Sequence, residues 1–284
     1  MKIAVACLAY MKNPAGAAVL AEYFRDAADL YLHVDAKSDI SPYVDVQSLH
    51  PNVVLAAERH PIFWGGFNTV KACVSTIKQA VATKDYERIL FITEDTIPLL
   101  GRSTFCERMS SSTEWIQIYP SDRIECLTRY TRYFFYDSFA TTPRHCEINQ
   151  REWTPDMVTA VGRLDSLMKR GKAPIHQMFT GGTWWGLTRA SIDKFISRYE
   201  QDEHLRESFE FSAIPEEQYL HTVLGNLPDA RPLVYTDFGR YPQPYVFQSV
   251  AEIAAAETHG APMLRKVPVG VPEIEAYIRE LARA

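Results

Sequence analysis

The chain has no apolar run that approaches the ~20 residues of a membrane-spanning helix. It also lacks a P-loop, a G-x-G-x-x-G motif, internal repeats and low-complexity segments, which argues against a dinucleotide-binding or repeat protein. Basic residues are not in excess, because 30 Lys and Arg face 35 Asp and Glu for a net charge of −5. A mildly acidic chain argues against nucleic acid as a partner, since such binding depends on cations that neutralise phosphates.

Cysteine is scarce, and the sequence contains no C-x-x-C pair. The five cysteines are odd in number and dispersed, so we expect reduced thiols, no disulfide framework and no zinc site. The segment 1–12 has no clear basic region, long apolar core or cleavage pattern, and is typical of a first strand. These features predict a cytoplasmic protein without a transmembrane segment, and they leave peripheral membrane association open.

The composition favours one large α/β unit. Of 284 residues, 46% are apolar and 23% charged, which easily supplies a globular core. Buried-type strands are predicted at 3–8, 31–34, 53–55, 89–92 and 114–119, with helices between several of them. This alternation indicates a Rossmann-like layered sheet. Later in the chain we expect helices at 154–169, 190–199, 215–225, 250–257 and 271–284, and strands at 183–187 and 233–236.

The segment 88–100, RILFITEDTIPLL, is the centre of the expected fold. Its apolar run predicts a strand buried on both faces, and Glu94 and Asp95 follow at the carboxyl end. In open α/β sheets that end is where ligands bind. Asp and Thr are also ordinary turn residues, so a binding site and a simple turn are equally favoured by this segment alone.

Other segments offer binding or structural interpretations. Asp35 opens a charged cluster after the second strand, and Trp64-Gly65-Gly66 precedes a helix whose free N–H groups could meet a ligand. Arginines alternate with aromatic residues over 123–137, which favours a packed hairpin over a phosphate site for most of them. Trp184 and Trp185 are adjacent, and one could pack in the core while the other meets a sugar.

Glu216 and Glu217 follow Pro215, which suits the first position of a helix. Negative charge in a first helical turn is stabilising by ~0.3–1 kcal/mol, so the helix dipole is a sufficient structural explanation. The same position keeps a carboxylate ionised, as a catalytic base requires. Neighbouring helical residues point about 100° apart, which makes a two-carboxylate glycosidase pair unsuitable here.

Taken together, the chain resembles the core-2/I-branching glycosyltransferase family, which also includes peptide O-xylosyltransferases, in the manner of its bacterial members. The resemblance extends over 2–267 and depends on the order of five motifs. These motifs are L-H-V-D-A-K-S-D at 32–39, W-G-G-F at 64–67, I-T-E-D-T-I-P-L at 92–99, T-W-W-G-L-T-R at 183–189 with P-E-E-Q-Y-L at 215–220, and L-R-K-V at 264–267.

The resemblance implies a GT-A fold: one catalytic domain over 1–284, with a nucleotide-sugar half at 1–120, an acceptor and catalytic half at 121–267, and a C-terminal helix at 268–284. It also implies inverting transfer from a UDP-sugar to a glycan or lipid-linked glycan acceptor, with GlcNAc the first donor to test, then xylose or glucose. Glu217 matches the family's general base. No metal and no other cofactor are expected, because basic side chains near the C-terminus would stabilise the UDP diphosphate.

The remaining roles are also implied by the resemblance. The predicted donor-binding residues are Asp35, Trp64, Gly65, Gly66, Arg265 and Lys266, with either Arg231 or Arg240 as a further diphosphate arginine. The predicted acceptor-binding residues are Glu94, Asp95, Trp184, Trp185 and Glu216.

Two positions depart from the family pattern. Thr96 stands where many members have aspartate, and Glu216 replaces the aspartate of the P-D-E motif. Two other functions therefore remain as alternatives. One is a catalytically silent nucleotide- or carbohydrate-binding protein on the same scaffold. The other is a metal-dependent transferase using Glu94 and Asp95, which is disfavoured because adjacent strand residues face opposite sides.

Overall fold

The structure is a computed structural model that describes residues 2–10, 13–121, 126, 129–130, 134–138, 177–268 and 270–284. Two sequence predictions concern other parts of the chain. The helix expected at 154–169 lies outside the described residues, and so does much of the Arg–aromatic segment 123–137.

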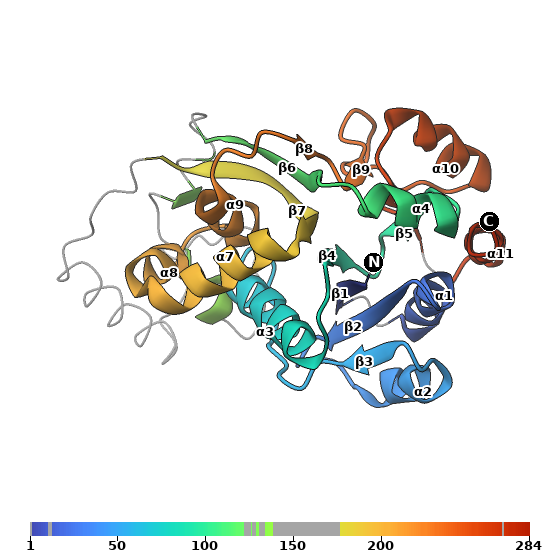
Figure 1. The fold of residues 1–284 in the computed structure, drawn as a ribbon, viewed down its shortest axis with the longest axis horizontal. Helices are drawn as coiled ribbons and strands as arrows, with labels where there is room; N and C mark the ends of the chain where they lie inside the picture. Colours follow the sequence, from blue (N-terminus) through green and yellow to red (C-terminus); the bar gives the residue numbers. More distant parts are fainter. Residues whose placement is uncertain are drawn as a thin grey trace.

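A mixed seven-stranded sheet forms the centre of the fold, in the order β3-β2-β1-β4-β7-β6-β8 (Figure 1). Its strands are β1 (Ile3–Ala9), β2 (Ala28–Val34), β3 (Val53–Leu55), β4 (Arg88–Thr93), β6 (Glu114–Pro120), β7 (Phe179–Thr188) and β8 (Ala230–Arg231). Strands β1 to β4 are parallel to one another, β7 is antiparallel to both β4 and β6, and β8 is parallel to β6. The predicted Rossmann-like sheet is confirmed.

The parallel strands lie between two apolar layers. All positions of β1 and β4 are buried, as their uninterrupted apolar runs predict. Successive residues of β1 alternate between two hydrophobic clusters: Ile3, Val5 and Cys7 pack in one, and Ala4 and Ala6 in the other. The alternation shows that helices cover both faces of the sheet.

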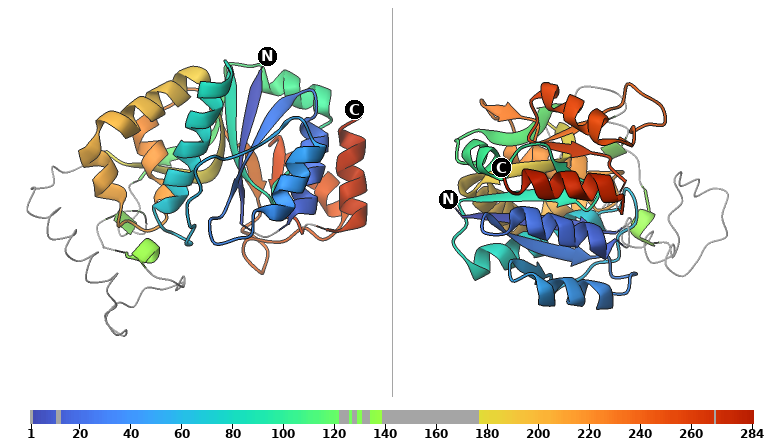
Figure 2. Two further views of the ribbon diagram at one scale, coloured as in Figure 1. Left: turned by 90° about the horizontal axis from the view of Figure 1, so that it is seen from below. Right: turned by 90° about the vertical axis from the view of Figure 1, so that its right-hand side faces the viewer.

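The helices form one layer on each side (Figure 2). The first face packs against α1 (Pro14–Phe24), α2 (Ser41–Leu49), α4 (Arg102–Met109), α10 (Val250–Ala256) and α11 (Pro272–Leu281). The second face packs against α3 (Asn68–Thr83), α7 (Arg189–Gln201), α8 (Glu203–Phe209) and α9 (Tyr219–Leu224). Short 3₁₀ turns are η1 (Tyr136–Ser138), η3 (Pro215–Glu217) and η4 (Glu257–His259).

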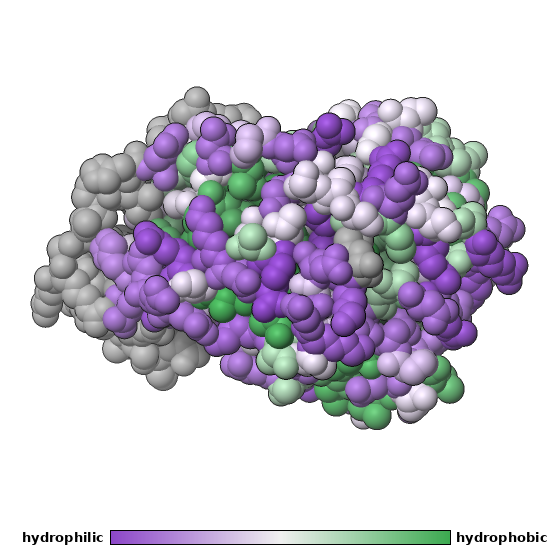
Figure 3. All heavy atoms as spheres, in the orientation of Figure 1, coloured by the Kyte–Doolittle hydropathy of each residue, from purple (hydrophilic) through white to green (hydrophobic). Residues whose placement is uncertain are grey.

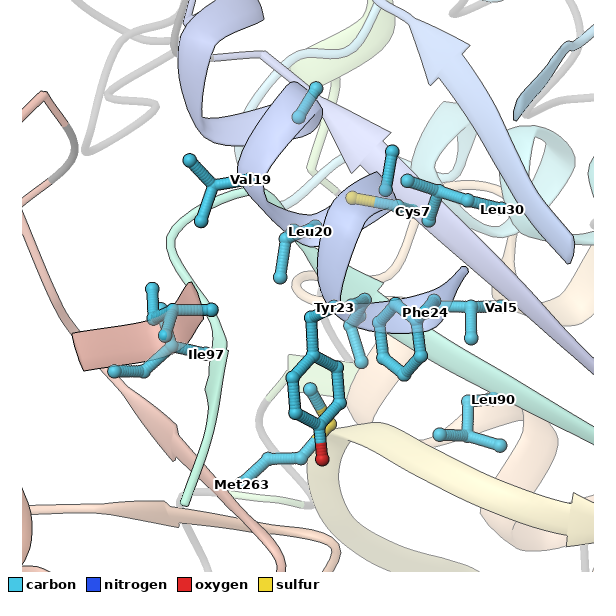
Figure 4. Packing of buried hydrophobic residues seen from close by; sticks show 14 of the residues in the cluster. Val5, Cys7, Val19, Leu20, Tyr23, Phe24, Leu30, Leu90, Ile97 and Met263 are labelled. Atoms are coloured by element: carbon cyan, nitrogen blue, oxygen red, sulfur yellow. The ribbon is translucent and has the colours of Figure 1, made fainter. Parts of the chain in front are cut away.

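Large aromatic side chains fix α1 to the first face (Figure 4). The rings of Tyr23 and Phe24 meet edge to face at a centroid distance of 5.0 Å, and both side chains are fully buried. The Tyr23 hydroxyl donates a hydrogen bond to the Leu100 carbonyl at 2.8 Å, so burial leaves its polar group satisfied. Burial of such a ring contributes about 1.5–3 kcal/mol.

A second sheet of three strands joins distant parts of the chain in the order β5-β10-β9. Its strands are β5 (Ile97–Pro98), β10 (Met263–Arg265) and β9 (Val234–Thr236). The central strand β10 is antiparallel to β5 and parallel to β9. The pairing with β5 brings Arg265 close to the residues that follow β4.

Several element boundaries differ from the sequence prediction. The helix expected from Pro215 to Gly225 is divided, because η3 ends before Gln218 and α9 begins at Tyr219. Ile214 precedes η3 in a left-handed conformation with φ of 52°. Strand β8 and helix α8 were not predicted, since β8 has only two residues and α8 directly follows α7.

Hydrophilic residues cover most of the face shown in Figure 3. This is expected where amphipathic helices turn their apolar sides toward a sheet. Among the residues that the structure describes, no helix is long and apolar enough to cross a membrane.

Candidate active site

Charged residues gather where the parallel strands end. Because β1, β2 and β4 run in the same direction, their carboxyl ends share one edge, here called the carboxyl edge. Tyr10 follows β1, Asp35 follows β2, and Glu94 and Asp95 follow β4. Such an edge is the usual ligand position of an α/β sheet. The structure therefore brings these strand-end side chains to one edge of the sheet.

Asp95 is the centre of a connected polar cluster. It is fully buried, and its Oδ1 accepts a hydrogen bond from Arg265 Nε at 3.1 Å. The Arg265 guanidinium lies over the Trp184 ring, 4.3 Å from its centroid, and its Nη2 donates to the Tyr10 hydroxyl. The Trp184 indole N–H donates to Thr93 at 3.0 Å. These contacts hold a cation rigidly at the carboxyl edge.

Glu94 has different surroundings from Asp95. It is also buried, but its Oε2 accepts a hydrogen bond from the Tyr43 hydroxyl at 3.0 Å. The two carboxylates therefore diverge toward α2 and toward β10. Among the described residues, no group of three or more His, Cys, Asp or Glu side chains is arranged to hold a metal ion. Neither carboxylate lies on an open surface, so the structure gives no support to their predicted contact with an acceptor.

Glu217 lies in η3 and forms an ion pair with Arg129, whose Nη1 is 2.7 Å from its Oε2. Both side chains are about one-third exposed, so the pair borders solvent. Burial raises the pKa of Glu217 above its ordinary value, while Arg129 and Arg265 oppose that shift. The result is a partly exposed carboxylate whose pKa is moved toward neutrality.

Glu216 points to a different environment from its neighbour Glu217. With Phe91 and Trp185 it lines a small, mostly apolar cavity, and its Oε2 is buried without a hydrogen-bond partner. Burial, reinforced by the negative charge of Glu217, raises the pKa of Glu216 to about 8. This shift favours the protonated, neutral form of Glu216 at pH 7. Its position favours packing under η3 over the predicted contact with an acceptor.

The two adjacent tryptophans are separated by the pleat of β7. Trp185 is buried and stacks on Phe91 at a centroid distance of 5.4 Å, so its ring belongs to the core. Trp184 is only partly buried and lies against the Arg265 guanidinium. The alternative in which one ring packs in the core is therefore correct for Trp185, and Trp184 remains the candidate for ligand contact.

The glycines of the W-G-G segment leave space that side chains of this protein occupy. A Cβ atom on Gly66 would lie 2.0 Å from Asp137 Oδ1, and one on Gly65 would lie 3.1 Å from the Tyr136 ring. The Asp137 carboxylate accepts a hydrogen bond from the Asn68 N–H at 2.8 Å, at the start of α3. That helix start is thus occupied by the chain itself. This explains the glycines more directly than the predicted approach of a ligand.

The W-G-G segment supports the turn η3, which carries Glu217. The Gly65 carbonyl accepts a hydrogen bond from the Ile214 N–H at 2.9 Å, immediately before η3. Gly65 has φ of +79°, a conformation that glycine adopts without strain. Trp64 is about half exposed and meets Tyr136 edge to face, so its ring is accessible to a ligand.

Asp35 is held by its own loop. Its carboxylate accepts hydrogen bonds from the Lys37 N–H at 3.0 Å, the Lys37 ammonium at 2.6 Å and the Ile62 N–H at 3.2 Å. The side chain is 6% exposed. These bonds fix the shape of the loop after β2, and a uridine would meet a preorganised loop there rather than a free carboxylate.

The four basic candidates for the diphosphate site are not equivalent. Arg231 pairs with Trp115 at the start of β6, at the opposite end of the sheet from Asp35 and Asp95. We call that end the amino edge. Arg231 is therefore misplaced for the role that the sequence suggested, because a two-residue strand gives no local sign of its position.

The other three lie at the carboxyl edge or follow strands that end there. Arg240 is neutralised by Asp237 at 2.6 Å and Glu252 at 3.4 Å, and its guanidinium stacks on Tyr245. Arg265 is committed to Asp95. No carboxylate of the described residues forms an ion pair with Lys266, so its charge is available to a ligand.

Two residues of the site were not singled out from the sequence. Tyr10 lies one residue beyond β1, and the strand-end rule that found Asp35 could have found it. Arg129 belongs to the Arg–aromatic segment that was interpreted as packing, and its partner Glu217 is 88 positions away. No local pattern indicates a contact over that separation.

The comparison with known families agrees with this geometry. The family model described as Core-2/I-Branching enzyme matches residues 8–233, which contain Asp35, Trp64, Asp95 and Glu217. No curated protein matches the chain. The mixed sheet covered by helices on both faces is consistent with the GT-A glycosyltransferase fold. The chain belongs to the core-2/I-branching enzyme family of glycosyltransferases.

Proposed function

We propose that the protein transfers a sugar from a UDP-sugar to a glycan hydroxyl with inversion, that Glu217 is the general base, and that fixed cations replace a metal. Membership of the family supports a nucleotide-sugar donor and a glycan acceptor. GlcNAc is the first donor sugar to test, followed by xylose and glucose.

The observation that carries the proposal is the position and chemistry of Glu217. A general base must reach an acceptor hydroxyl and be ionised at the working pH, with a pKa near that pH. Glu217 borders solvent, is oriented by Arg129 at 2.7 Å, and has a pKa raised by burial. It would remove the proton of the acceptor hydroxyl as that oxygen attacks the anomeric carbon and the bond to UDP breaks.

The departing diphosphate requires positive charge. Arg265 is held by Asp95 and Trp184, and Lys266 follows it without a carboxylate partner among the described residues. Preorganised cations stabilise developing negative charge without reorganisation of the site. The adjacent pair, one anchored and one free, supports a diphosphate site at the end of β10.

The first test measures thermal unfolding in EDTA with UDP, UDP-GlcNAc, UDP-xylose, UDP-glucose and GDP-glucose. A ligand at 100 times its Kd adds ~2.7 kcal/mol to the stability, which raises Tm by several degrees. We expect shifts with the UDP compounds and none with GDP-glucose, and the largest shift nominates the donor. A shift that requires Mn²⁺ would contradict the metal-independent site.

The second test separates binding from chemistry. Glu217→Gln keeps the shape of the side chain but removes the base, so transfer should fall ~10²–10⁴-fold while the UDP-induced shift is retained. Glu280→Gln, on the exposed side of α11, is the matched control and should transfer at the wild-type rate. Substantial turnover by Glu217→Gln would remove Glu217 as the base. If the wild-type protein binds UDP but transfers sugar to none of the acceptors tested, the alternative of a catalytically silent binding protein would be favoured.

A further inference from the structure

A cleft of about 590 Å³ lies at the amino edge, away from the site described above. Its walls come from the end of α4, the start of β6, β8 and the segment after η4, which lie together in the upper half of Figure 1. The polar side chains lining it belong to Arg108, Ser111, Thr113, Trp115, Arg231 and His259. A pocket of this volume accommodates a ligand of more than one ring.

The lining of this cleft is positive in a protein of net charge −5. It contains two arginines and no Asp or Glu side chain. Arg108 donates a hydrogen bond to the Gly260 carbonyl at 2.9 Å, and no described carboxylate forms an ion pair with it. Arg231 forms an ion pair at 3.6 Å with Asp229, which also accepts a hydrogen bond from Thr113, but the Arg231 side chain is 67% exposed. Both guanidinium groups can therefore bind an anion.

A buried donor in the same cleft lacks a partner. Trp115 is only 5% exposed, and its indole Nε1 is buried without a hydrogen bond. An indole N–H can only donate, and a buried donor left unpaired costs about 1–3 kcal/mol. Because this atom is buried, an acceptor oxygen of a bound molecule would reach it only after the surrounding wall shifts. The Ser111 and Thr113 hydroxyls on the same wall already donate to the Arg108 carbonyl and to the Asp229 carboxylate, so toward a ligand they can only accept hydrogen bonds.

The wall between α4 and β6 is held rigidly. Arg88 is buried and donates to the carbonyls of Met109, Gly186 and Ser111 at 2.6–2.7 Å. These bonds fix the residues on either side of Ser110, next to Arg108. A preformed wall lowers the entropic cost of ordering a ligand.

The cleft is too large for an inorganic anion alone, and its lining includes the apolar Pro232 and Ala261. A sugar ring offers both an apolar face and many oxygen acceptors. A carboxylate or phosphate on that sugar supplies the charge that the two arginines favour.

We propose that this cleft is a second carbohydrate site, which binds an acidic sugar unit through Arg108 and Arg231. The glycan class of this ligand rests on the proposed function. The six residues of β4 span ~20 Å at about 3.3 Å each, which sets the approximate separation of the two edges. The second site would therefore hold a distant unit of an extended acceptor, or a separate glycan chain.

The test is isothermal titration at low ionic strength with trigalacturonate, maltotriose and inorganic phosphate. We expect trigalacturonate to bind at least tenfold more tightly than either maltotriose or phosphate. Arg108→Ala with Arg231→Ala should weaken that binding more than tenfold. Arg198→Ala is the matched control. It removes an exposed arginine that lies outside the cleft and pairs with Asp202, and this variant should bind trigalacturonate like wild type.

The variants must keep their fold and their first site. An unchanged Tm in the double variant would show that the fold is intact, and an unchanged UDP-induced shift would show that the first site is intact. Arg231→Ala alone removes one of the two arginines and tests the site with a smaller change. Equal binding of phosphate and trigalacturonate would overturn the carbohydrate assignment. No binding of trigalacturonate, or binding that the double variant retains, would overturn the site. A wild-type protein that binds trigalacturonate but not UDP would contradict the proposed function and leave the second site standing.

Discussion

The two edges of the central sheet carry charge in different ways. At the carboxyl edge the charges form close pairs: Asp35 with Lys37, Asp95 with Arg265, and Glu217 with Arg129. At the amino edge the cleft contains arginines and no carboxylate in its lining. The paired arrangement is typical of a site that must hold groups in fixed positions during a reaction.

The difference teaches that charge alone does not identify a diphosphate site. Arg231 has a carboxylate, Asp229, at 3.6 Å, and Lys266 has none among the described residues, but the two basic residues also lie at opposite edges of the sheet. Position relative to strand direction decides which of them can meet a donor bound at the carboxyl edge. Variants that disturb one ion pair at a time can show whether the paired charges hold groups in fixed positions.

The largest effect is expected from Arg265→Met. This change leaves the buried Asp95 carboxylate without its cation, and breaking such a pair typically costs about 3–5 kcal/mol. Tm should fall by about 6–20 °C at ~2–4 °C per kcal/mol, as measured by calorimetry. Lys266→Met is the matched control because no described carboxylate depends on Lys266. It should leave Tm within ~2 °C of wild type and weaken UDP binding.

The double variant Asp95→Asn with Arg265→Met checks the cause. If the uncompensated charge is responsible, removing the carboxylate as well should recover a large part of the lost stability. A double variant as unstable as Arg265→Met alone would show that packing against Trp184 matters more than the ion pair.

A smaller effect is expected from Arg129→Met, which disturbs orientation without burying a lone charge. The Glu217 carboxylate would lose its 2.7 Å partner, and misplacement of a catalytic group costs ~10–100-fold in rate. Arg129 lowers the Glu217 pKa, so its loss should move the acid limb of the pH–rate profile to higher pH. The rate is therefore measured from pH 5 to 9. An unmoved acid limb would contradict the role of Glu217 as the titrating base.

The ion pairs that set the order of these effects depend on the fold, and only part of that fold could be predicted from the sequence. The strands β1 and β4 were predictable because a parallel strand buried on both faces needs an uninterrupted apolar run. The position of β7 was not, because the chain reaches it after more than fifty residues and inserts it antiparallel between β4 and β6. Local patterns carry strand identity, and they do not carry strand order.

The candidate site shows the same division. Asp35 and Glu217 could be named because each stands at a recognisable local position, after a strand or after Pro215. The partners Arg265 for Asp95 and Arg129 for Glu217 are 170 and 88 residues distant, and only the fold brings them together. The structural reason for Gly65 and Gly66 was hidden from the sequence in a similar way, since the side chains that approach them come from residues 136–137.

The smallest effect is expected from Glu216→Gln, which tests whether the carboxyl edge holds a neutral acid beside its base. Burial raises the folded-state pKa of Glu216 from 4.5 to about 8, so the folded protein keeps a proton that the unfolded chain releases. Stability should therefore fall as pH rises from 6.5 to 8, by up to ~1.4 kcal/mol per pH unit. Glutamine cannot titrate, so the variant should lose this slope in urea unfolding measured at several pH values.

Between pH 6.5 and 8, the titration of Glu216 can be distinguished from that of the buried groups Asp137 and His33. Asp137 has a pKa raised to about 6 by burial, and His33 has one lowered to about 4, so both change charge mainly below the window. Asp137→Asn is the matched control, since it alters a buried carboxylate near Glu216 but should retain the slope above pH 6.5. If Glu216→Gln keeps the wild-type slope, Glu216 is ionised in the folded protein, and η3 then carries two negative charges facing one arginine.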